Sequence, residues 1–314
     1  MKKVLIFGGS GQIGRHLIRR LTNKNYLVTV VTRNLHKKGI ALRLGGNPGY
    51  IEIIETNIFD EEKLKDLFKD KDICINLVGI LSESKKNTFK NIHTYFPALL
   101  SKKCEKYKLK QFIHISALGV DKAIDSKYAK SKLEGEKNIL ENFSKTIILR
   151  PSVIYSVDDS FTTNLMTLLS LLPVFPLYYG GKTKFLPIHV SEICEIILHV
   201  MEKNIFDEII ECVGPEELSF KEIIKKLLVS IDKKRILVNL PLFLARIIIF
   251  FLEKFPRPLI TQDQLTLLKY DNIISKKYKS NLDIGYKAKL KFEDEIKKYS
   301  HMWRKGGEYS KKRD

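Results

Sequence analysis

Short apolar runs alternate with helix-like patterns along the first half of the chain. Within each run successive residues are apolar and many are β-branched, which is typical of parallel strands buried on both faces. The predicted strands are Val4–Phe7, Leu27–Thr32, Ile51–Ile54, Ile73–Val78, Phe112–Ser116 and Thr146–Leu149.

Apolar residues at helical spacing lie between these strands. The spacing predicts a helix over Ile13–Leu21 and a short one that begins after Asp60, a residue favoured as an N-cap. A longer helix is predicted over Phe89–Cys104, with a kink at Pro97 because proline has no N–H to donate, and another over Lys127–Asn142. The alternation predicts an α/β fold, a Rossmann-type doubly wound parallel sheet with right-handed crossovers.

The pattern loosens after Pro151. A short strand is predicted at Ile209–Val213, then a helix that starts at Ser219, with Glu222 at the spacing of a capping box. We find no internal repeat or low-complexity linker, so this half is expected to pack on the first as a smaller C-terminal α/β substrate-binding region. The predicted divisions are 1–155 for the dinucleotide-binding domain, 156–285 for the smaller substrate or partner region, and 286–314 for a basic C-terminal tail.

Two apolar blocks stand out in the second half, Leu165–Tyr179 and Leu240–Leu252. Prolines interrupt the first, and the second contains Pro241 and Arg246 and falls short of the roughly 20 residues that cross a bilayer. They are read either as buried helices or as an apolar patch bordered by lysines. Such a patch would lie on a membrane or a membrane partner, or line the entry for a lipidic quinone.

The chain of 314 residues is strongly basic, with 55 Lys+Arg against 36 Asp+Glu and a formal charge of +19. The basic residues are spread out, with no long unbroken run and no alternation with aromatics, so no nucleic-acid partner is expected. Peripheral contact with an anionic membrane accounts better for the charge.

The cysteines are scattered, with no C-x-x-C pair and no metal-like cluster, which is typical of reduced thiols in an intracellular protein. They are Cys74, Cys104, Cys194 and Cys212. Only four apolar residues lie between Lys3 and Gly8, too few for a signal peptide. We therefore expect a cytoplasmic protein that sits peripherally on the inner face of the membrane.

A glycine-rich segment, Gly8–Gly14, follows the first predicted strand and opens the first predicted helix. In a dinucleotide-binding turn the first glycine permits the tight turn, the second lets the backbone approach a pyrophosphate, and the third lets helix and strand pack closely. The helix N-terminus then offers free N–H groups to the anion. The predicted contacts are Gly8, Ser10, Gly11, Gln12, Ile13 and Gly14.

The second predicted strand ends at Thr32 and Arg33. An acidic residue normally stands there when the 2′-hydroxyl of NAD is bound, and it would repel the 2′-phosphate of NADP. A guanidinium instead forms a charge-assisted hydrogen bond with a phosphate. The sequence therefore predicts a preference for NADP(H) over NAD(H), unless Arg33 is simply a solvated loop residue.

Tyr128 and Lys132 are one helical turn apart on the predicted helix Lys127–Asn142, so they share a face. An ammonium beside a phenol is expected to lower the phenol's pKa, which makes Tyr128 a candidate general acid or base. Lys132 is also placed to bind the ribose next to the nicotinamide. Ser116, at the end of the fifth predicted strand, is expected to orient a substrate oxygen.

The G-x-x-G-x-x-G spacing resembles the short-chain dehydrogenase/reductase superfamily, in its extended or atypical, NAD-dependent epimerase/dehydratase-like branch. The resemblance implies contacts to adenine, to the adenine ribose and to the nicotinamide from three further segments. These contacts are Asn57 with Ile58, Leu77 with Val78 and Gly79, and Pro151 with Val153. His189 matches a segment of the smaller domain and is either a ligand contact or a hydrogen-bonded structural residue.

A narrower resemblance covers nearly the whole chain. Ser116–Gly119, Glu134–Glu136, Leu240–Leu242 and Pro258–Gln264 with Asp271-Asn272 are similar to the nucleotide-binding accessory subunit of respiratory complex I and its bacterial relatives. That family implies a tightly held NADP(H) with a structural or assembly role at a respiratory membrane complex, or a partner among quinone-metabolism proteins.

Because the catalytic-type residues Ser116, Tyr128 and Lys132 are all present, an active NADP-dependent oxidoreductase or epimerase remains the alternative. A basic nucleic-acid-associated nucleotide sensor is the least favoured reading. No metal site is expected.

Overall fold

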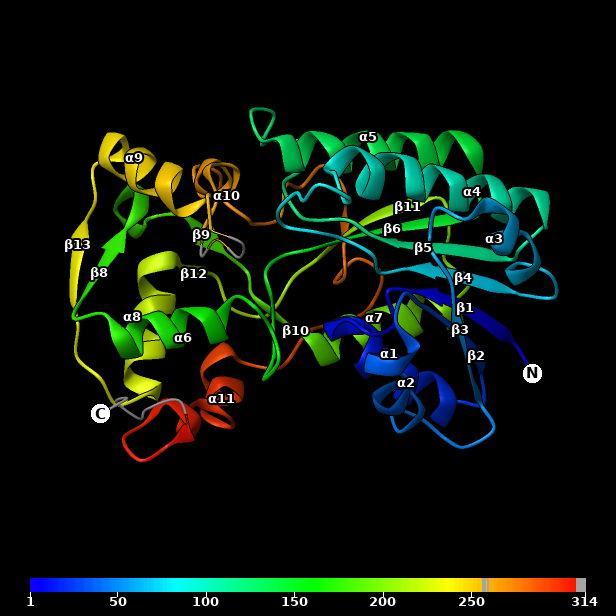
Figure 1. Cartoon of the computed structure of the whole chain (residues 1–314), viewed down its shortest axis with the longest axis horizontal. Helices are drawn as coiled ribbons and strands as arrows, with labels where there is room; N and C mark the ends of the chain where they lie inside the picture. The colour runs from blue at the N-terminus through cyan, green and yellow to red at the C-terminus, as the bar shows by residue number, and fades with distance from the viewer. Residues whose placement is uncertain (256–257, 259, 309–314) are drawn as a thin grey trace.

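A parallel sheet organises the larger part of the molecule (Figure 1). The computed structural model describes residues 1–255, 258 and 260–308. Within this part of the chain, eight strands pair in the order β14-β11-β6-β5-β4-β1-β2-β3. They are β1 (Lys3–Phe7), β2 (Leu27–Thr32), β3 (Ile51–Glu55), β4 (Ile73–Asn76), β5 (Gln111–Ile115), β6 (Thr146–Pro151), β11 (Glu208–Cys212) and β14 (Lys279–Ser280).

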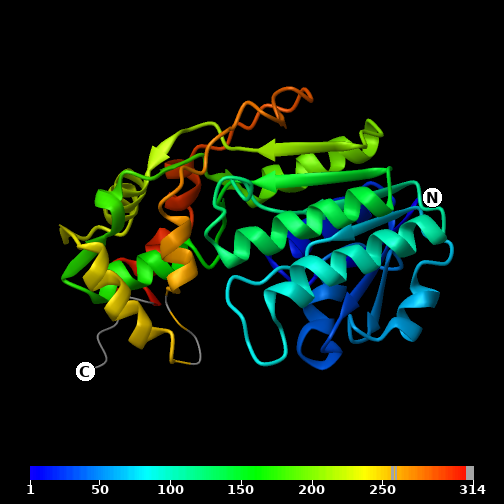
Figure 2. The same cartoon turned by 90° about the horizontal axis from the view of Figure 1, so that it is seen from above.

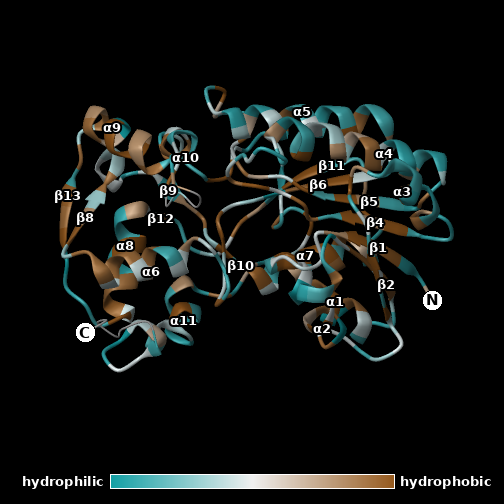
Figure 3. Ribbon diagram, viewed as in Figure 1, coloured by the Kyte–Doolittle hydropathy of each residue, from teal (hydrophilic) through white to brown (hydrophobic). Residues whose placement is uncertain are grey.

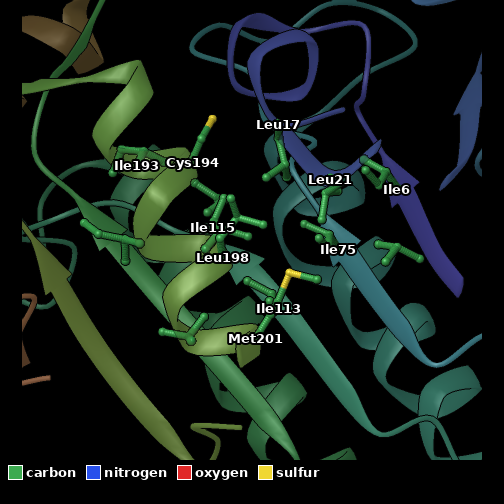
Figure 4. Packing of buried hydrophobic residues seen from close by; sticks show 14 of the residues in the cluster. Ile6, Leu17, Leu21, Ile75, Ile113, Ile115, Ile193, Cys194, Leu198 and Met201 are labelled. Carbon is green, nitrogen blue, oxygen red and sulfur yellow. The ribbon is translucent and has the colours of Figure 1, made fainter. Parts of the chain in front are cut away.

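Helices cover both faces of this sheet, as the predicted Rossmann-type fold requires. One face carries α1 (Gln12–Asn23), α2 (Leu35–Arg43) and α7 (Val190–Glu202). The other carries α3 (Glu61–Leu67), η1 (Lys90–Tyr95) with α4 (Phe96–Lys106), and α5 (Lys127–Asn142). Figure 4 shows α1 and α7 packed side by side on the sheet through Leu17, Leu21, Ile193 and Leu198, all 0–2% exposed.

Local signals in the sequence predicted these elements well. The carboxylate of Asp60 accepts a hydrogen bond from the Lys63 nitrogen at 3.2 Å, which confirms it as the N-cap of α3. Strand β4 ends at Asn76, short of the predicted Val78, because the Asn76 side chain accepts from the Val78 nitrogen and turns the chain. Helix α2 was not predicted: it buries only Gly39 and Leu42, so its sequence shows little apolar periodicity.

The expected kink at Pro97 is realised as a change of helix type. Residues Lys90–Tyr95 form a π-helix, and the α-helix that follows has Pro97 in its first turn. Proline has no N–H to donate to the preceding turn, and the change from π-helix to α-helix occurs beside it. The π-helical segment brings His93 and Thr94 into the interior, where both are buried.

A smaller layer of short elements stands beside the sheet and has its own apolar core (Figures 1 and 2). Its short strand pairs are β7 (Ile154–Tyr155) with β10 (Ile188–His189), β8 (Val174–Leu177) with β13 (Ile236–Asn239), and β9 (Lys184–Phe185) with β12 (Leu218–Ser219). Its helices are α6 (Thr162–Leu171), η2 (Tyr178–Gly181), α8 (Phe220–Ser230), α9 (Leu242–Leu252), α10 (Gln262–Leu267), α11 (Phe292–Lys297) and η3 (Ser300–Trp303). The capping box predicted at Ser219 and Glu222 is present at the start of α8.

The chain does not keep to the expected division at residue 155. After the first elements of the smaller layer it returns to the large sheet, where β11 pairs in parallel with β6 and β14 extends the edge. Ile210 and Cys212 of β11 are fully buried, as is most of α7. Pairing β6 with a further strand covers what would otherwise be an exposed sheet edge, which explains the return.

The lysine-rich segment expected as a tail from residue 286 is folded into the smaller layer as far as residue 308. Phe292, Ile296, Tyr299 and Trp303 are all at most 6% exposed and belong to its core. The lysines at the ends of α11, Lys291, Lys297 and Lys298, are exposed to solvent, so the apolar residues at helical spacing are hard to recognise among the charges. Residues 309–314 of the expected tail lie outside the described residues, as does Leu259 of the family-like segment.

The two apolar blocks, Leu165–Tyr179 and Leu240–Leu252, differ in how far they are buried. The first becomes α6 and β8, which bury Met166, Leu169 and Phe175. The second becomes α9, which buries only Ala245 and Ile249 and leaves most of its apolar side chains exposed. Figure 3 shows α9 coloured as hydrophobic along much of its length. The buried-helix reading is therefore wrong for α9. In the part of the chain that the structure describes, none of the helices has the length and apolarity needed to span a bilayer.

Candidate functional site

A cavity of about 470 Å³ opens where the carboxyl ends of β1, β4, β5 and β6 meet the smaller layer. In open α/β sheets ligands bind at this edge, next to the point where the strand order reverses, here between β1 and β4. Ten of the residues predicted from the sequence line it: Gln12, Ile13, Leu77, Val78, Gly79, Ser116, Tyr128, Lys132, Pro151 and Val153.

The glycine-rich turn between β1 and α1 has the shape that a pyrophosphate needs. Gly8 has a φ of +81°, and a Cβ there would lie 2.9 Å from the carbonyl carbon of Leu77. A Cβ on Gly14 would lie 2.4 Å from Gly9, so only glycine lets α1 pack against the turn. Gly11 is the N-cap of α1, which has no side-chain cap and no acidic residue in its first turn. The turn therefore fits an anion bound by backbone N–H groups.

Two cations lie around this turn. Arg33 follows β2 and its Nη1 lies 3.5 Å from Oδ1 of Asn87, while the Lys38 ammonium donates to Oγ of Ser10 at 3.3 Å. Both side chains are exposed, and Thr32 is buried at the end of β2. The cations stand at the edge where the sheet presents the glycine turn, outside the cavity itself.

Asn57 and Ile58, after β3, do not line the cavity. The Asn57 side chain accepts from the Phe59 nitrogen at 3.1 Å and so closes its own turn. Ile58 is 5% exposed and packs in the core under α3 and α4. Their predicted contact with adenine stays a prediction, since it concerns the end of the sheet beyond the cavity.

Lys132, Tyr128 and Ser116 come together at the cavity wall. The Lys132 ammonium donates to the Ile115 carbonyl oxygen at 2.9 Å, and burial lowers its pKa to about 8. Burial, helped by the negative charge of Asp263, raises the pKa of Tyr128 to about 12. The expected lowering of the phenol pKa by Lys132 is therefore not found. The Ser116 hydroxyl is buried and has no hydrogen-bond partner among the described residues.

His93 was not singled out from the sequence, yet it supports Tyr128. Its ring lies edge-on to the Tyr128 ring, with centroids 5.2 Å apart. Its Nε2 accepts from the Ile80 nitrogen at 3.1 Å, so its proton is on Nδ1, which lies 3.0 Å from Oγ of Ser131. Burial lowers the His93 pKa to about 2, so the ring stays neutral. An isolated histidine in a helical pattern gives no sequence signal for this role.

The far wall of the cavity comes from the smaller layer and from the loop between β5 and α5, and most of it was not predicted from the sequence. Asn272 is its polar anchor: its side chain accepts from the Ser152 hydroxyl at 2.6 Å and donates to the Leu118 carbonyl at 2.8 Å. The family-like segment Asp271-Asn272 was a usable signal, whereas the apolar members of the wall look like any core residue. They include Leu118, Val120, Phe161, Phe185, Leu267 and Leu268.

Arg150, which precedes the predicted contact Pro151, and His189 have structural roles. Arg150 is fully buried and donates to both carboxylate oxygens of Glu136, at 3.0 and 2.6 Å, with the Tyr278 ring stacked on its guanidinium. His189 is the N-cap of α7, where its Nδ1 accepts from the Ser191 nitrogen. Burial lowers the His189 pKa to about 4, so of the two readings of this histidine the structural one fits.

The sheet order, the glycine turn and the group around Tyr128 define a Rossmann-type dinucleotide-binding protein. The model of the NAD dependent epimerase/dehydratase family matches residues 4–210, and the chain belongs to this family.

Among the described residues, no three His, Cys, Asp or Glu side chains are grouped so as to hold a metal ion.

Two relatives are named as subunits of mitochondrial NADH-ubiquinone oxidoreductase or NADH dehydrogenase. The NADH-ubiquinone oxidoreductase 40 kDa subunit, mitochondrial, of Neurospora crassa is 24% identical over 282 residues, covering 89% of this chain and 74% of that protein. The NADH dehydrogenase (ubiquinone) 1 alpha subcomplex subunit 9, mitochondrial, of Mus musculus is 24% identical over 283 residues, covering 89% and 75%. These relatives confirm the resemblance to the complex I accessory subunit.

A solved structure confirms the fold. The UDP-glucuronic acid 4-epimerase from Bacillus cereus, in complex with UDP-glucuronic acid and NAD, has a TM-score of 0.72 to this chain. The two are 21% identical, and the match covers 95% of this chain and 98% of that one.

Proposed function

We propose that this protein is a component of a membrane-bound respiratory complex and holds a dinucleotide for a structural or assembly role. The observation that carries the proposal is the state of Tyr128. Its pKa is raised to about 12 and the Lys132 ammonium is bonded to the Ile115 carbonyl, so the phenol is poorly matched to proton transfer near neutral pH. The likeness to complex I subunits along 89% of the chain supports the same role.

The dinucleotide is NADP(H) in this proposal. The Gly8–Gly14 turn and the α1 N-terminus would hold the pyrophosphate, and Lys132 would hold the ribose next to the nicotinamide. Arg33 and Lys38 supply the positive charge that a 2′-phosphate requires, and an acidic residue is not present at the end of β2. The bound nucleotide would contact both the large sheet and the smaller layer, because residues of both line the cavity.

The membrane lies against α9. Phe243, Ile247 and Phe251 repeat at one-turn spacing and are 53–65% exposed, a large apolar face for a protein surface. Arg246 is exposed on the same helix, and the Lys254 ammonium lies 4.8 Å from the centre of the Phe250 ring. An apolar helix face bordered by cations suits the interface of an anionic bilayer. The protein would therefore sit at the membrane face of its complex.

Two variants test the structural role. Tyr128→Phe removes the phenol hydroxyl and spares the packing, whereas Gly11→Asp puts a carboxylate where the pyrophosphate would lie. We expect the nucleotide identified by mass spectrometry, and assembly of the respiratory complex on native gels, to survive Tyr128→Phe and to be lost with Gly11→Asp. Ligand binding stabilises a native state by about 4 kcal/mol at a thousandfold excess over Kd. Equal assembly defects in both variants would contradict a purely structural role.

An active reductase or epimerase is the second candidate, favoured by the buried Ser116 hydroxyl that has no partner among the described residues. In that case Ser116 would donate to a substrate oxygen and Tyr128 would exchange a proton with it. Tyr128→Phe would then lower the turnover rate by about 10²–10⁴ while leaving nucleotide binding intact.

A further inference from the structure

The side of the cavity away from the glycine turn has a chemistry of its own. We propose that it binds an uncharged, largely apolar molecule that presents a carbonyl or hydroxyl group to Ser116 and Tyr128. This proposal rests on the proposed function only in that the dinucleotide occupies the Gly8–Gly14 side and leaves the other side free.

The first argument is charge. Of all the described residues that line the cavity, the charged ones are Lys132 and Asp271. The Lys132 ammonium already donates to the Ile115 carbonyl, and a bound dinucleotide would face it. Asp271 accepts from the Lys184 nitrogen at 2.9 Å and would repel a phosphate. A nucleoside diphosphate carries negative charges that need paired cations when they leave water.

Two lysines of the smaller layer that adjoin the lining residues Phe185 and Leu268 in sequence do not supply those cations. The Lys184 ammonium pairs with Glu217 at 2.8 Å, and the Lys269 ammonium pairs with Asp125 at 3.3 Å. Both lysine side chains are about half exposed and neither lines the cavity. Among the described residues, the far wall therefore offers no unpaired cation to an anionic ligand.

The second argument is the apolar surface. Leu118, Val120 and Phe185 are at most 6% exposed and form most of the apolar part of the wall. Phe161 at the start of α6 and Leu267 on α10 complete it. Burial of apolar area is the contribution such a wall offers to a ligand, about 25 cal/mol per Å². The described polar groups at its inner end, Ser116 and Tyr128, would fix the orientation of one oxygen.

The ligand expected for this chain differs in class from the ligand of a protein with the same fold. The Bacillus cereus epimerase, which shares the fold, was solved with UDP-glucuronic acid and NAD. In this chain the far wall is mostly apolar, and its polar side chain Asn272 is already hydrogen-bonded to Ser152 and Leu118, so we expect a different class of ligand on the same fold.

A fluorescent ketone tests the inference. 6-Propionyl-2-dimethylaminonaphthalene is uncharged, carries one carbonyl group on an apolar body, and emits at shorter wavelength in apolar surroundings. Added to the full chain with NADPH present, it should give a saturable emission shift with one site per protein. UDP-glucose in large excess should not displace it.

Two cavity variants and one surface variant locate the probe. Leu267→Glu and Phe161→Gln should each weaken probe binding about tenfold or more, since each removes apolar contact at the wall. Phe251→Glu, on the exposed face of α9, should leave the affinity unchanged. NADPH binding, followed by nucleotide fluorescence, shows that each variant is folded and tests the proposed function separately.

Displacement by UDP-glucose would overturn the inference, as would loss of the probe in Phe251→Glu but not in the cavity variants. If NADPH fails to bind the unmutated protein while the probe still binds to the cavity, the proposed function fails and the apolar site stands.

Discussion

The carboxylate of Asp263, on α10, accepts a hydrogen bond from the backbone nitrogen of Tyr128 at 3.1 Å, across 135 positions of the chain. It also accepts from the Lys127 nitrogen at 2.7 Å and from the Ser126 hydroxyl at 2.8 Å. An acidic group from a distant helix thus caps α5, the helix that carries Tyr128 and Lys132. Because α10 also packs against α9, the exposed apolar helix and the dinucleotide site share one structural connection.

Replacement of Asp263 by asparagine should destabilise the protein by about 1–2 kcal/mol, because the N-terminus of α5 loses a charged cap. Urea unfolding measures the change. The pKa of Tyr128 should fall at the same time, since the Asp263 charge raises it, and an ultraviolet titration of the phenol follows that shift. Asp125→Asn, which removes an exposed carboxylate paired with Lys269, is the matched control and should change stability little.

Cofactor preference depends on Arg33. We expect NADPH to bind at least about tenfold more tightly than NADH, which corresponds to about 1.4 kcal/mol. Arg33→Asp should remove most of that difference, because a carboxylate repels the 2′-phosphate. Arg19→Asp makes the same charge change at an exposed position of α1 and should preserve it. Calorimetric titration of both nucleotides gives the affinities, and equal values in the unmutated protein would contradict the assignment.

Membrane association depends on the exposed face of α9. The protein should sediment with anionic liposomes and be released by salt, because surface attraction is screened over about 8–10 Å at physiological ionic strength. Serine at Phe243, Ile247 and Phe251 together should abolish sedimentation. Serine at Ile40 and Leu44, the comparably exposed apolar residues of and next to α2, should leave it intact. Sedimentation that does not respond to lipid charge would show that the cations have no part in it.

The titration of Lys132 predicts a pH dependence of stability. Burial lowers its pKa to about 8 from the ordinary 10.5, so between these values the unfolded chain binds more protons than the folded protein. The contribution of Lys132 to the free energy of unfolding therefore becomes more favourable as pH rises from about 8 to about 10.5. Below that interval the penalty of the buried ammonium is fully present.

Lys132→Met lacks this titration. The unmutated protein should gain on the order of 3 kcal/mol in unfolding free energy across that interval, and Lys132→Met should not gain it. The difference between the variant and the unmutated protein should therefore shift by that amount against the variant. Urea denaturation of the nucleotide-free proteins at several pH values measures the difference. Lys130→Met, at an exposed position of the same helix, should show a constant difference. A constant difference for Lys132→Met as well would mean that the ammonium is hydrated in the folded protein.

Much of the dinucleotide site could be predicted because its determinants are local. The conformation of Gly8 and the close packing at Gly14 are demands of a single strand–turn–helix unit, and residue spacing alone displays them. Ser116 and Lys132 follow from the end of one strand and one face of one helix. Parallel pairing then brings the ends of successive strands to the same edge of the sheet, so these residues converge on one cavity.

The electrostatics of that cavity could not be predicted in the same way. Whether Lys132 lowers the pKa of Tyr128 depends on where its ammonium finds an acceptor, and that acceptor is the Ile115 carbonyl. The negative charge of Asp263, contributed by a helix far along the chain, acts in the opposite direction. The spacing of four residues between Tyr128 and Lys132 places both on one helix face, but it does not reveal the Ile115 carbonyl or the Asp263 carboxylate.

The sequence by itself determined the periodicities: which segments become buried strands, where helices begin at Asp60 and Ser219, and where glycines permit the turn that opens the first helix. Only the tertiary structure decided which apolar helices would be covered. Leu240–Leu252 is far more apolar than Ile13–Leu21, yet α1 is packed on the sheet beside α7 while α9 leaves Phe243 and Phe251 in solvent. The physical reason is that the hydrophobic effect is non-directional: an apolar helix face is buried only where another part of the folded chain covers it, and the helix's own sequence does not specify that part.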